Sequence, residues 1–200
     1  MLDVTHQADI AVLRMRHGKV NALDIELCEH ITGRLEELGT SSVRAVVLTG
    51  QAGIFSAGVD LLRALEGDAG YLRDFLPVLR KLFDVAFFYP KPVVAAINGH
   101  AIAGGCVLAC AADQRLMARG SGRIGVTELL VGLPFPAIAL EIMRFTAVPA
   151  PTWCGSRSAS RTRKTSSPTS SRGWRRRDDL VSRAQRSTPE LGCSRVPARL

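Results

Sequence analysis

Apolar residues are grouped in short continuous runs that predict the strands of the chain. Residues 10–15 (IAVLRM) and 44–49 (RAVVLT) are two such runs, and residues 93–97 (VVAAI) are a third that ends in an Asn-Gly turn. Runs of this length that do not alternate with polar residues are typical of strands buried on both faces. A further short strand is predicted over residues 113–117.

Between these strands, apolar residues recur at helical spacing. Asp24 is the predicted N-cap of a helix that continues through Leu38. Residues 71–88 predict a second helix, in which Pro77 should cause a kink or mark a break. Residues 136–145 predict a third helix that begins with proline. The side chains expected on the buried face of the first helix are Leu27, Ile31, Leu35 and Leu38.

Strands that alternate with helices favour an α/β fold built on a buried parallel sheet. No run of 18 apolar residues occurs, and no basic segment precedes an apolar one at the N-terminus, so neither a membrane span nor a secretory leader is expected. The five cysteines show no C-x-x-C pair, which favours reduced thiols and no zinc site. The sequence therefore predicts a cytoplasmic protein without a metal.

The charge of the chain is concentrated in its last quarter. Residues 151–200 hold twelve of the 26 basic residues but only three of the 18 acidic residues. This quarter is rich in serine, threonine and arginine, and it shows neither helical nor strand periodicity. We therefore divide the chain into a core at residues 1–150 and a basic tail at residues 151–200, for which we expect local disorder.

Three interpretations of the basic tail remain open. An out-of-frame reading of GC-rich DNA would produce such an abrupt change to Arg, Ser, Thr and Pro. A solvated basic appendage without a function would look the same. The run at residues 172–177 (RGWRRR) could also bind nucleic acid through phosphate contacts and base stacking, which is the least favoured of the three.

Two glycine-rich loops follow predicted buried strands and carry the candidate chemistry. Residues 50–61 follow one strand, and residues 98–105 lead from another into a stretch of small and apolar residues that predicts a helix. Because glycine and alanine have little or no side chain, backbone N–H groups at a helix start can approach a ligand closely. These groups lie at the positive end of the helix dipole. Such groups can form an oxyanion hole. Close packing of the helix is the alternative explanation for the glycines.

Three motifs in order resemble the crotonase family, also called the enoyl-CoA hydratase/isomerase superfamily. They are residues 55–61 (FSAGVDL), 96–106 (AINGHAIAGGC) and 125–134 (GVTELLVGLP). Residues 19–23 (KVNAL) resemble the early loop of that family, which contacts coenzyme A. The resemblance runs from about residue 4 to residue 150 and then stops.

The resemblance implies a spiral of ββα units around a parallel buried sheet, with the C-terminal helical part missing or replaced. It implies an acyl-CoA substrate, with coenzyme A as part of that substrate and no other cofactor, and a homotrimer or hexamer without membrane or nucleic-acid partners. The matching catalytic groups are the backbone N–H groups of Ala57 and Gly104 and the carboxylate of Glu128. The matching substrate-binding residues are Val20, Asn21, Ala22, Ala57, Gly58, Val59, Asp60, Gly104 and Gly105.

One position departs from the family pattern. The first catalytic carboxylate of the family would fall at position 107, where this chain has Val107. Hydration of a conjugated thioester is well served by two carboxylates, whereas one base can move a double bond from the 3,4 to the 2,3 position. The sequence therefore favours an enoyl-CoA isomerase. An enoyl-CoA hydratase and a truncated, non-catalytic acyl-CoA binder are the alternatives.

Overall fold

The computed structural model describes residues 1–67, 69–128, 132, 135–147 and 193–195 of the 200-residue chain. Its largest sheet has the strand order β1-β2-β4-β7-β9-β11. These strands are Leu2–Gln7, Ile10–Met15, Ala45–Thr49, Val93–Ile97, Gln114–Ala118 and Cys193–Arg195. β2, β4, β7 and β9 are mutually parallel, as the continuous apolar runs predicted.

Both edges of this sheet carry antiparallel strands that the sequence did not predict. β1 pairs with β2 from Leu2 opposite Met15 to Gln7 opposite Ile10, and most of its residues are exposed. β11 pairs with β9, with Cys193 opposite Ala118. Residues 193–195 thus form a strand where only irregular chain was expected, because the free edge of β9 offers unpaired backbone groups. The rest of the predicted tail, residues 151–192 and 196–200, lies outside the described residues.

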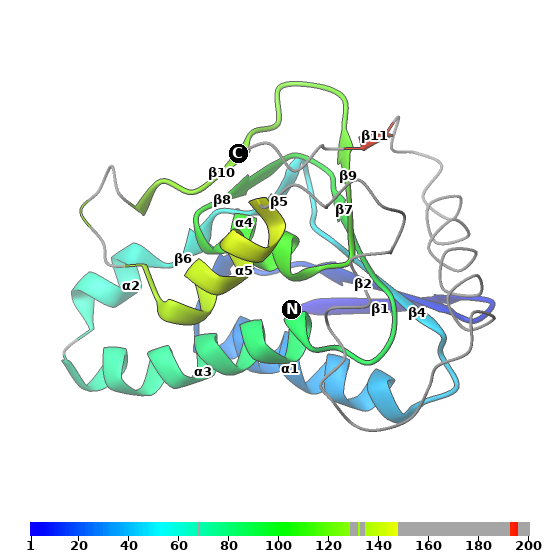
Figure 1. Cartoon of the computed structure of the whole chain (residues 1–200). Coiled ribbons are helices and arrows are strands. Elements are labelled where there is room, and N and C mark those ends of the chain that lie inside the picture. The colour runs from blue at the N-terminus through cyan, green and yellow to red at the C-terminus, as the bar shows by residue number, and fades with distance from the viewer. Residues whose placement is uncertain (68, 129–131, 133–134, 148–192, 196–200) are drawn as a thin grey trace.

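Helices α1 (Ile25–Thr40) and α3 (Ala69–Phe87) lie side by side along one side of the sheet (Figure 1). The Asp24 side chain accepts a hydrogen bond from the N–H of Leu27 and caps α1, as predicted. The apolar face of α1 is buried as the periodicity indicated. Its buried residues are Leu27, Cys28, Ile31, Thr32, Leu35 and Leu38.

Pro77 does not break α3, since the helix continues through it to Phe87. A proline inside a helix removes one hydrogen bond and costs about 3 kcal/mol. Pro77 is exposed, whereas Phe75 and Leu79 on either side of it are buried in the core. Burial of the apolar face of α3 therefore offsets the local loss of the hydrogen bond. No helix among the described residues combines the length and apolar character needed to cross a bilayer.

Two small parallel sheets connect the glycine-rich loops to the rest of the fold. One joins β3 (Ala22–Leu23) to β6 (Gly58–Val59). The other has the order β10-β8-β5, with strands Ile124–Gly125, His100–Ile102 and Ile54–Ser56. A short helix, α2 (Leu61–Glu66), follows β6 directly, and α4 (Gly104–Ala111) follows β8. Each glycine-rich loop therefore ends at a helix start, close to the other.

Helix α4 is the centre of the core. All eight of its residues are buried, and α5 (Ala137–Ala147) packs across it in Figure 1. A Cβ atom at Gly105 would lie 2.5 Å from the carbonyl oxygen of Ser56 and 2.8 Å from the Ser56 Cβ. Gly105 therefore lets the loop at residues 54–56 approach α4 backbone to backbone.

We predict that Gly105→Ala lowers the free energy of unfolding by about 1–3 kcal/mol, because the added methyl group would displace the Ser56 backbone. Gly33→Ala is the matched control, since Gly33 lies on the exposed side of α1 and a Cβ there would meet nothing within 4 Å. That control should raise the free energy of unfolding by roughly 0.5–1 kcal/mol through helix propensity. Urea unfolding followed by circular dichroism measures both, and equal stabilisation by both substitutions would contradict the packing described here.

Candidate active site

The two glycine-rich loops meet at Gly58 and Gly104. Gly58 has φ +86°, and a Cβ atom there would lie 2.8 Å from the backbone nitrogen of Gly104 and 2.7 Å from the carbonyl oxygen of Ile102. A side chain at Gly58 would therefore be strained and would separate β6 from the start of α4. This contact explains why the residues that the sequence singled out in two separate loops lie at one place in the fold.

The first residues of α4 present backbone N–H groups that have no partner within the helix. Ala103 is the N-cap, and its side chain makes no capping hydrogen bond. The N–H groups of Cys106 and Val107 both reach the carbonyl of Ala103, so Gly104 and Gly105 precede the first helical hydrogen bonds. The Gly104 N–H also lies at the positive end of the helix dipole, which favours a negatively charged oxygen.

The second donor differs from the one that the sequence indicated. The N–H of Ala57 donates to the carbonyl of Val20 at 3.0 Å, so it is already satisfied. The N–H of Asp60 donates to the carbonyl of Leu23. In the β3–β6 ladder, Leu23 lies opposite Val59. Successive residues of a parallel strand point their N–H groups to opposite sides.

The N–H of Val59 therefore points away from β3, on the side where α4 begins. A Cβ atom on Gly104 would lie 3.6 Å from the Val59 nitrogen, so the backbone of Val59 runs beside the start of α4. The pair of backbone donors that the geometry offers is Val59 and Gly104. Ala57, which the sequence indicated as one of the donors, bonds the Val20 carbonyl through its N–H.

Asn21 is buried and holds the loops together rather than facing a ligand. Its side chain accepts from the N–H of His17 at 2.8 Å and donates to the carbonyl of Phe55 at 3.1 Å. The hydroxyl of Ser56 donates to the Asn21 carbonyl and accepts from the N–H of Gly58. The Asn21 side chain thus has an internal role, and the indicated binding of substrate by this residue stays a prediction. The sequence pattern could not separate these two roles.

Asn98 makes a second bridge between the loops. Its side-chain oxygen accepts from the N–H of Gly50 at 3.0 Å, and its amide nitrogen donates to the carbonyl of Ile54 at 3.3 Å. The Asn-Gly turn at the end of β7 thus fixes the loop that leads to β6.

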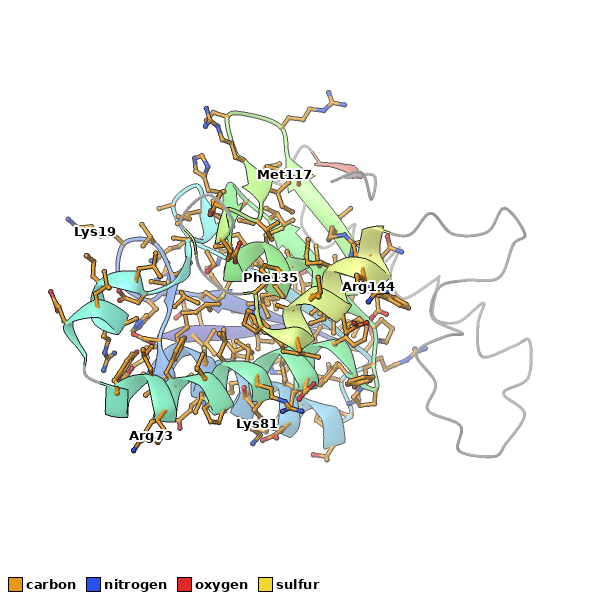
Figure 2. The ribbon with its side chains drawn as sticks, turned by 60° about the vertical axis from the view of Figure 1, so that its left-hand side comes forward. Lys19, Arg73, Lys81, Met117, Phe135 and Arg144 are labelled. Atoms are coloured by element: carbon orange, nitrogen blue, oxygen red, sulfur yellow. The ribbon has the colours of Figure 1, made fainter. Side chains whose placement is uncertain are left out.

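The remaining predicted binding residues lie around the two donors. Val20 is exposed, Ala22 is half-buried and Gly105 is buried behind Gly104. The Asp60 side chain accepts from the N–H of Arg63 at 3.1 Å and caps α2. Figure 2 shows Lys19 pointing outward from the loop before Val20, where its ammonium group is exposed to solvent.

Glu128 follows β10, which pairs with β8 and so places the segment beside the start of α4. The residue is half-buried, and its Oε2 atom is enclosed without a hydrogen-bond partner among the residues the structure describes. An enclosed carboxylate oxygen without a partner carries a desolvation cost, so it is a candidate for contact with a ligand.

The charge of Glu128 also acts on the thiol of Cys106 in α4. A hydrogen bond with Cys110 and burial raise the pKa of Cys106, and the nearby Glu128 carboxylate adds to this effect. Glu128 therefore lies close to the residue that precedes Val107. The Val107 side chain is 1% exposed, and it places a hydrocarbon surface where the family pattern has a carboxylate.

A charged cluster near the donors was not found from the sequence. Its members are His17, Asp24, Glu26 and Arg63, and they come from three separate segments. Arg63 and Glu26 are 37 residues apart, so no short motif contains both. Among the described residues, no group of three or more His, Cys, Asp and Glu side chains is arranged to hold a metal ion.

The described site combines two glycine-rich loops that meet at the start of a buried helix with a half-buried glutamate, Glu128, whose Oε2 atom is enclosed. Comparison with known proteins identifies the class of protein. The enoyl-CoA hydratase/isomerase family model matches residues 5–149, so the chain belongs to the enoyl-CoA hydratase/isomerase, or crotonase, family.

Several relatives are similar over this core. The mitochondrial enoyl-CoA delta isomerase 1 of Mus musculus is 34% identical over 139 residues, which are 68% of this chain and 48% of the relative. A putative enoyl-CoA hydratase of Thermus thermophilus is 38% identical over 62% of this chain and 50% of the relative. The crystal structure of a probable enoyl-CoA hydratase from Mycobacterium tuberculosis is similar with a TM-score of 0.67 at 35% identity, covering 72% of this chain and 61% of that one. The chain thus spans about half the length of the curated relatives it matches.

We predict that Asn21→Ala lowers the free energy of unfolding by about 2–4 kcal/mol, because it leaves the Phe55 carbonyl and the His17 N–H without partners. Asn21 also has φ +49°, which alanine tolerates poorly. Asn21→Gly removes the same hydrogen bonds but accepts this backbone conformation, so it should cost about 1 kcal/mol less than Asn21→Ala. Thermal unfolding of both variants measures this order, and a neutral effect of Asn21→Ala would contradict the internal role.

Proposed function

We propose that this protein shifts the double bond of an unsaturated acyl-CoA thioester from the 3,4 to the 2,3 position, using one glutamate and two backbone N–H groups. The observation that carries the proposal is the composition of the site. The Gly104 N–H begins α4, the Val59 backbone runs beside it, Glu128 carries an enclosed carboxylate oxygen, and position 107 holds a buried valine. A site with one carboxylate suits proton transfer within a substrate better than the addition of water.

The two donors stabilise the charge that forms on the substrate. The N–H groups of Val59 and Gly104 hydrogen-bond the thioester carbonyl oxygen, which becomes an oxyanion when a proton leaves C2. Because they belong to a rigid backbone in the buried core, they need little reorganisation as the charge develops. Removal of one such donor typically costs about 10²- to 10³-fold in turnover.

Glu128 then acts as both base and acid. Its carboxylate removes the proton from C2, and the electrons of the C2–H bond pass into a dienolate whose negative oxygen lies at the two donors. The protonated Glu128 returns the proton to C4, the double bond re-forms between C2 and C3, and the oxyanion collapses to the carbonyl. The reaction consumes no water and leaves the carboxylate as it began.

An enoyl-CoA hydratase is the second candidate, because the putative Thermus thermophilus enzyme is as similar to this chain as the mouse isomerase is. A hydratase would need Glu128 alone to hold and activate water, since Val107 cannot accept a hydrogen bond. The third candidate is an acyl-CoA binder without turnover. The family-type homotrimer is part of the proposal.

We predict that Glu128→Gln reduces isomerase turnover by about 10²- to 10⁴-fold, because the amide cannot take a proton from C2. Binding of a saturated acyl-CoA should stay within about threefold of wild type, since the amide keeps the size and polarity of the side chain. Turnover is followed by chromatography of the acyl-CoA products, and binding by calorimetry.

The matched control is Glu37→Gln, because Glu37 is an exposed carboxylate on α1 whose one ion pair among the described residues is with Arg34 of its own helix. This control should leave both turnover and binding unchanged. Wild-type turnover by the Glu128→Gln variant would overturn the proposed role of Glu128.

A further inference from the structure

Helix α2 lies next to the proposed donor Val59 but has no hydrophobic anchor. None of its six residues is buried, and the leucines along it are largely exposed. A surface helix is normally held by an apolar face against the core, which α2 lacks. The exposed leucines of α2 are Leu61, Leu62 and Leu65.

The side chain of Arg63 connects α2 to the start of α1 by hydrogen bonds and an ion pair. Its two terminal nitrogens each donate to one carboxylate oxygen of Glu26 at 2.6 Å, and one of them also reaches Asp24 at 3.1 Å. The guanidinium carbon also lies 5.4 Å from the centre of the Tyr71 ring. A bidentate pair within a network of charges holds its geometry better than a single surface ion pair.

Asp24, one of the two carboxylates that bind Arg63, is held in place by further contacts. Asp24 is 4% exposed, caps α1 and also bonds the ring of His17 at 2.6 Å. Arg63 also donates to this carboxylate. The buried Asp24 side chain therefore has three hydrogen-bond partners, which are the Leu27 N–H, the His17 ring and Arg63. The hydrogen bond from Arg63 also lowers the pKa of Glu26, so the pair is charged at neutral pH.

A short path connects Arg63 to the donor. The backbone N–H of Arg63 bonds the side chain of Asp60, and the Asp60 N–H bonds the Leu23 carbonyl. Val59 is the residue before Asp60, so a shift of α2 would turn the peptide group that carries the Val59 N–H. Resting on the proposed function, we propose that Arg63 is a positioning residue that holds α2 against α1 and thereby fixes the Val59 N–H at the substrate carbonyl.

The test uses a chromophoric arylacryloyl-CoA, whose absorption band moves to the red when donors polarise its carbonyl. Wild type should shift the band on binding. Arg63→Met, which keeps the length of the side chain but not its charge, should lose at least half of this red shift and about 10- to 100-fold of kcat, with KM within about threefold. A purely structural role would lower the amount of folded protein but leave the band of the bound probe in place.

Three further variants sharpen the test. Arg34→Met removes an exposed pair within one helix, with Glu37, and should leave the band and kcat unchanged. Arg63→Lys keeps the charge but cannot form the bidentate pair with Glu26, so its red shift should lie between those of Arg63→Met and wild type. Glu26→Gln should lower the red shift less than Arg63→Met does, and Arg63→Met should have a smaller effect in the Glu26→Gln background, because both residues act through the same contact.

The outcomes separate the two proposals. A wild-type red shift that Arg63→Met leaves intact would overturn the positioning role while leaving the oxyanion assignment standing. The absence of a red shift in wild type with bound probe would overturn both. If Arg63→Met fails to fold, as judged by circular dichroism, the milder Glu26→Gln carries the same test, and an unchanged band in that folded variant would overturn the positioning role.

Discussion

The close approach of two backbone segments, Gly58 and the start of α4, is the constraint on which the site depends. A single methyl group at Gly58 would lie within 3 Å of the Gly104 nitrogen. Because backbone meets backbone there, two loops distant in sequence come together at one place, where the proposed donors belong to them. The side chains of Asn21 and Asn98 bond the Phe55 carbonyl and the Gly50 N–H, so both hold the segment that leads to Gly58. Stability and chemistry therefore depend on the same few atoms.

The proposed use of backbone donors also determines which residues of the site can alter the reaction. Donors that belong to the backbone persist through side-chain substitutions, so the carboxylates around them decide the reaction. In this chain, one carboxylate position is filled by Val107 inside the apolar core, and the remaining one is Glu128. The same backbone framework can serve isomerases and hydratases, consistent with relatives of both names at similar identity.

The sequence predicted the parallel strands, the capped helix α1 and the glycine loops, because each has a local signal of period, cap or turn. It also placed Gly104 correctly at the first turn of a helix. It indicated Ala57 as the second donor, because nothing in the local pattern shows that the Ala57 N–H bonds the Val20 carbonyl. It missed the Arg63 cluster because Arg63 and Glu26 are 37 residues apart and leave no periodic trace. It missed the edge strand β1 because most of that strand is exposed and has no continuous apolar run. It allowed either a kink or a break at Pro77, and of these the break does not occur, because tertiary burial keeps α3 continuous.

The most direct test of the central claim is the reaction of the purified chain with a 3-enoyl-CoA in deuterated water, followed by mass spectrometry of the product. One base acting between C2 and C4 should give the 2-enoyl-CoA with no added water, and any deuterium it carries should come from exchange at Glu128. A 3-hydroxyacyl-CoA as the main product would show that water is added despite Val107. Unchanged substrate from folded protein that binds the thioester would also contradict the proposed isomerase.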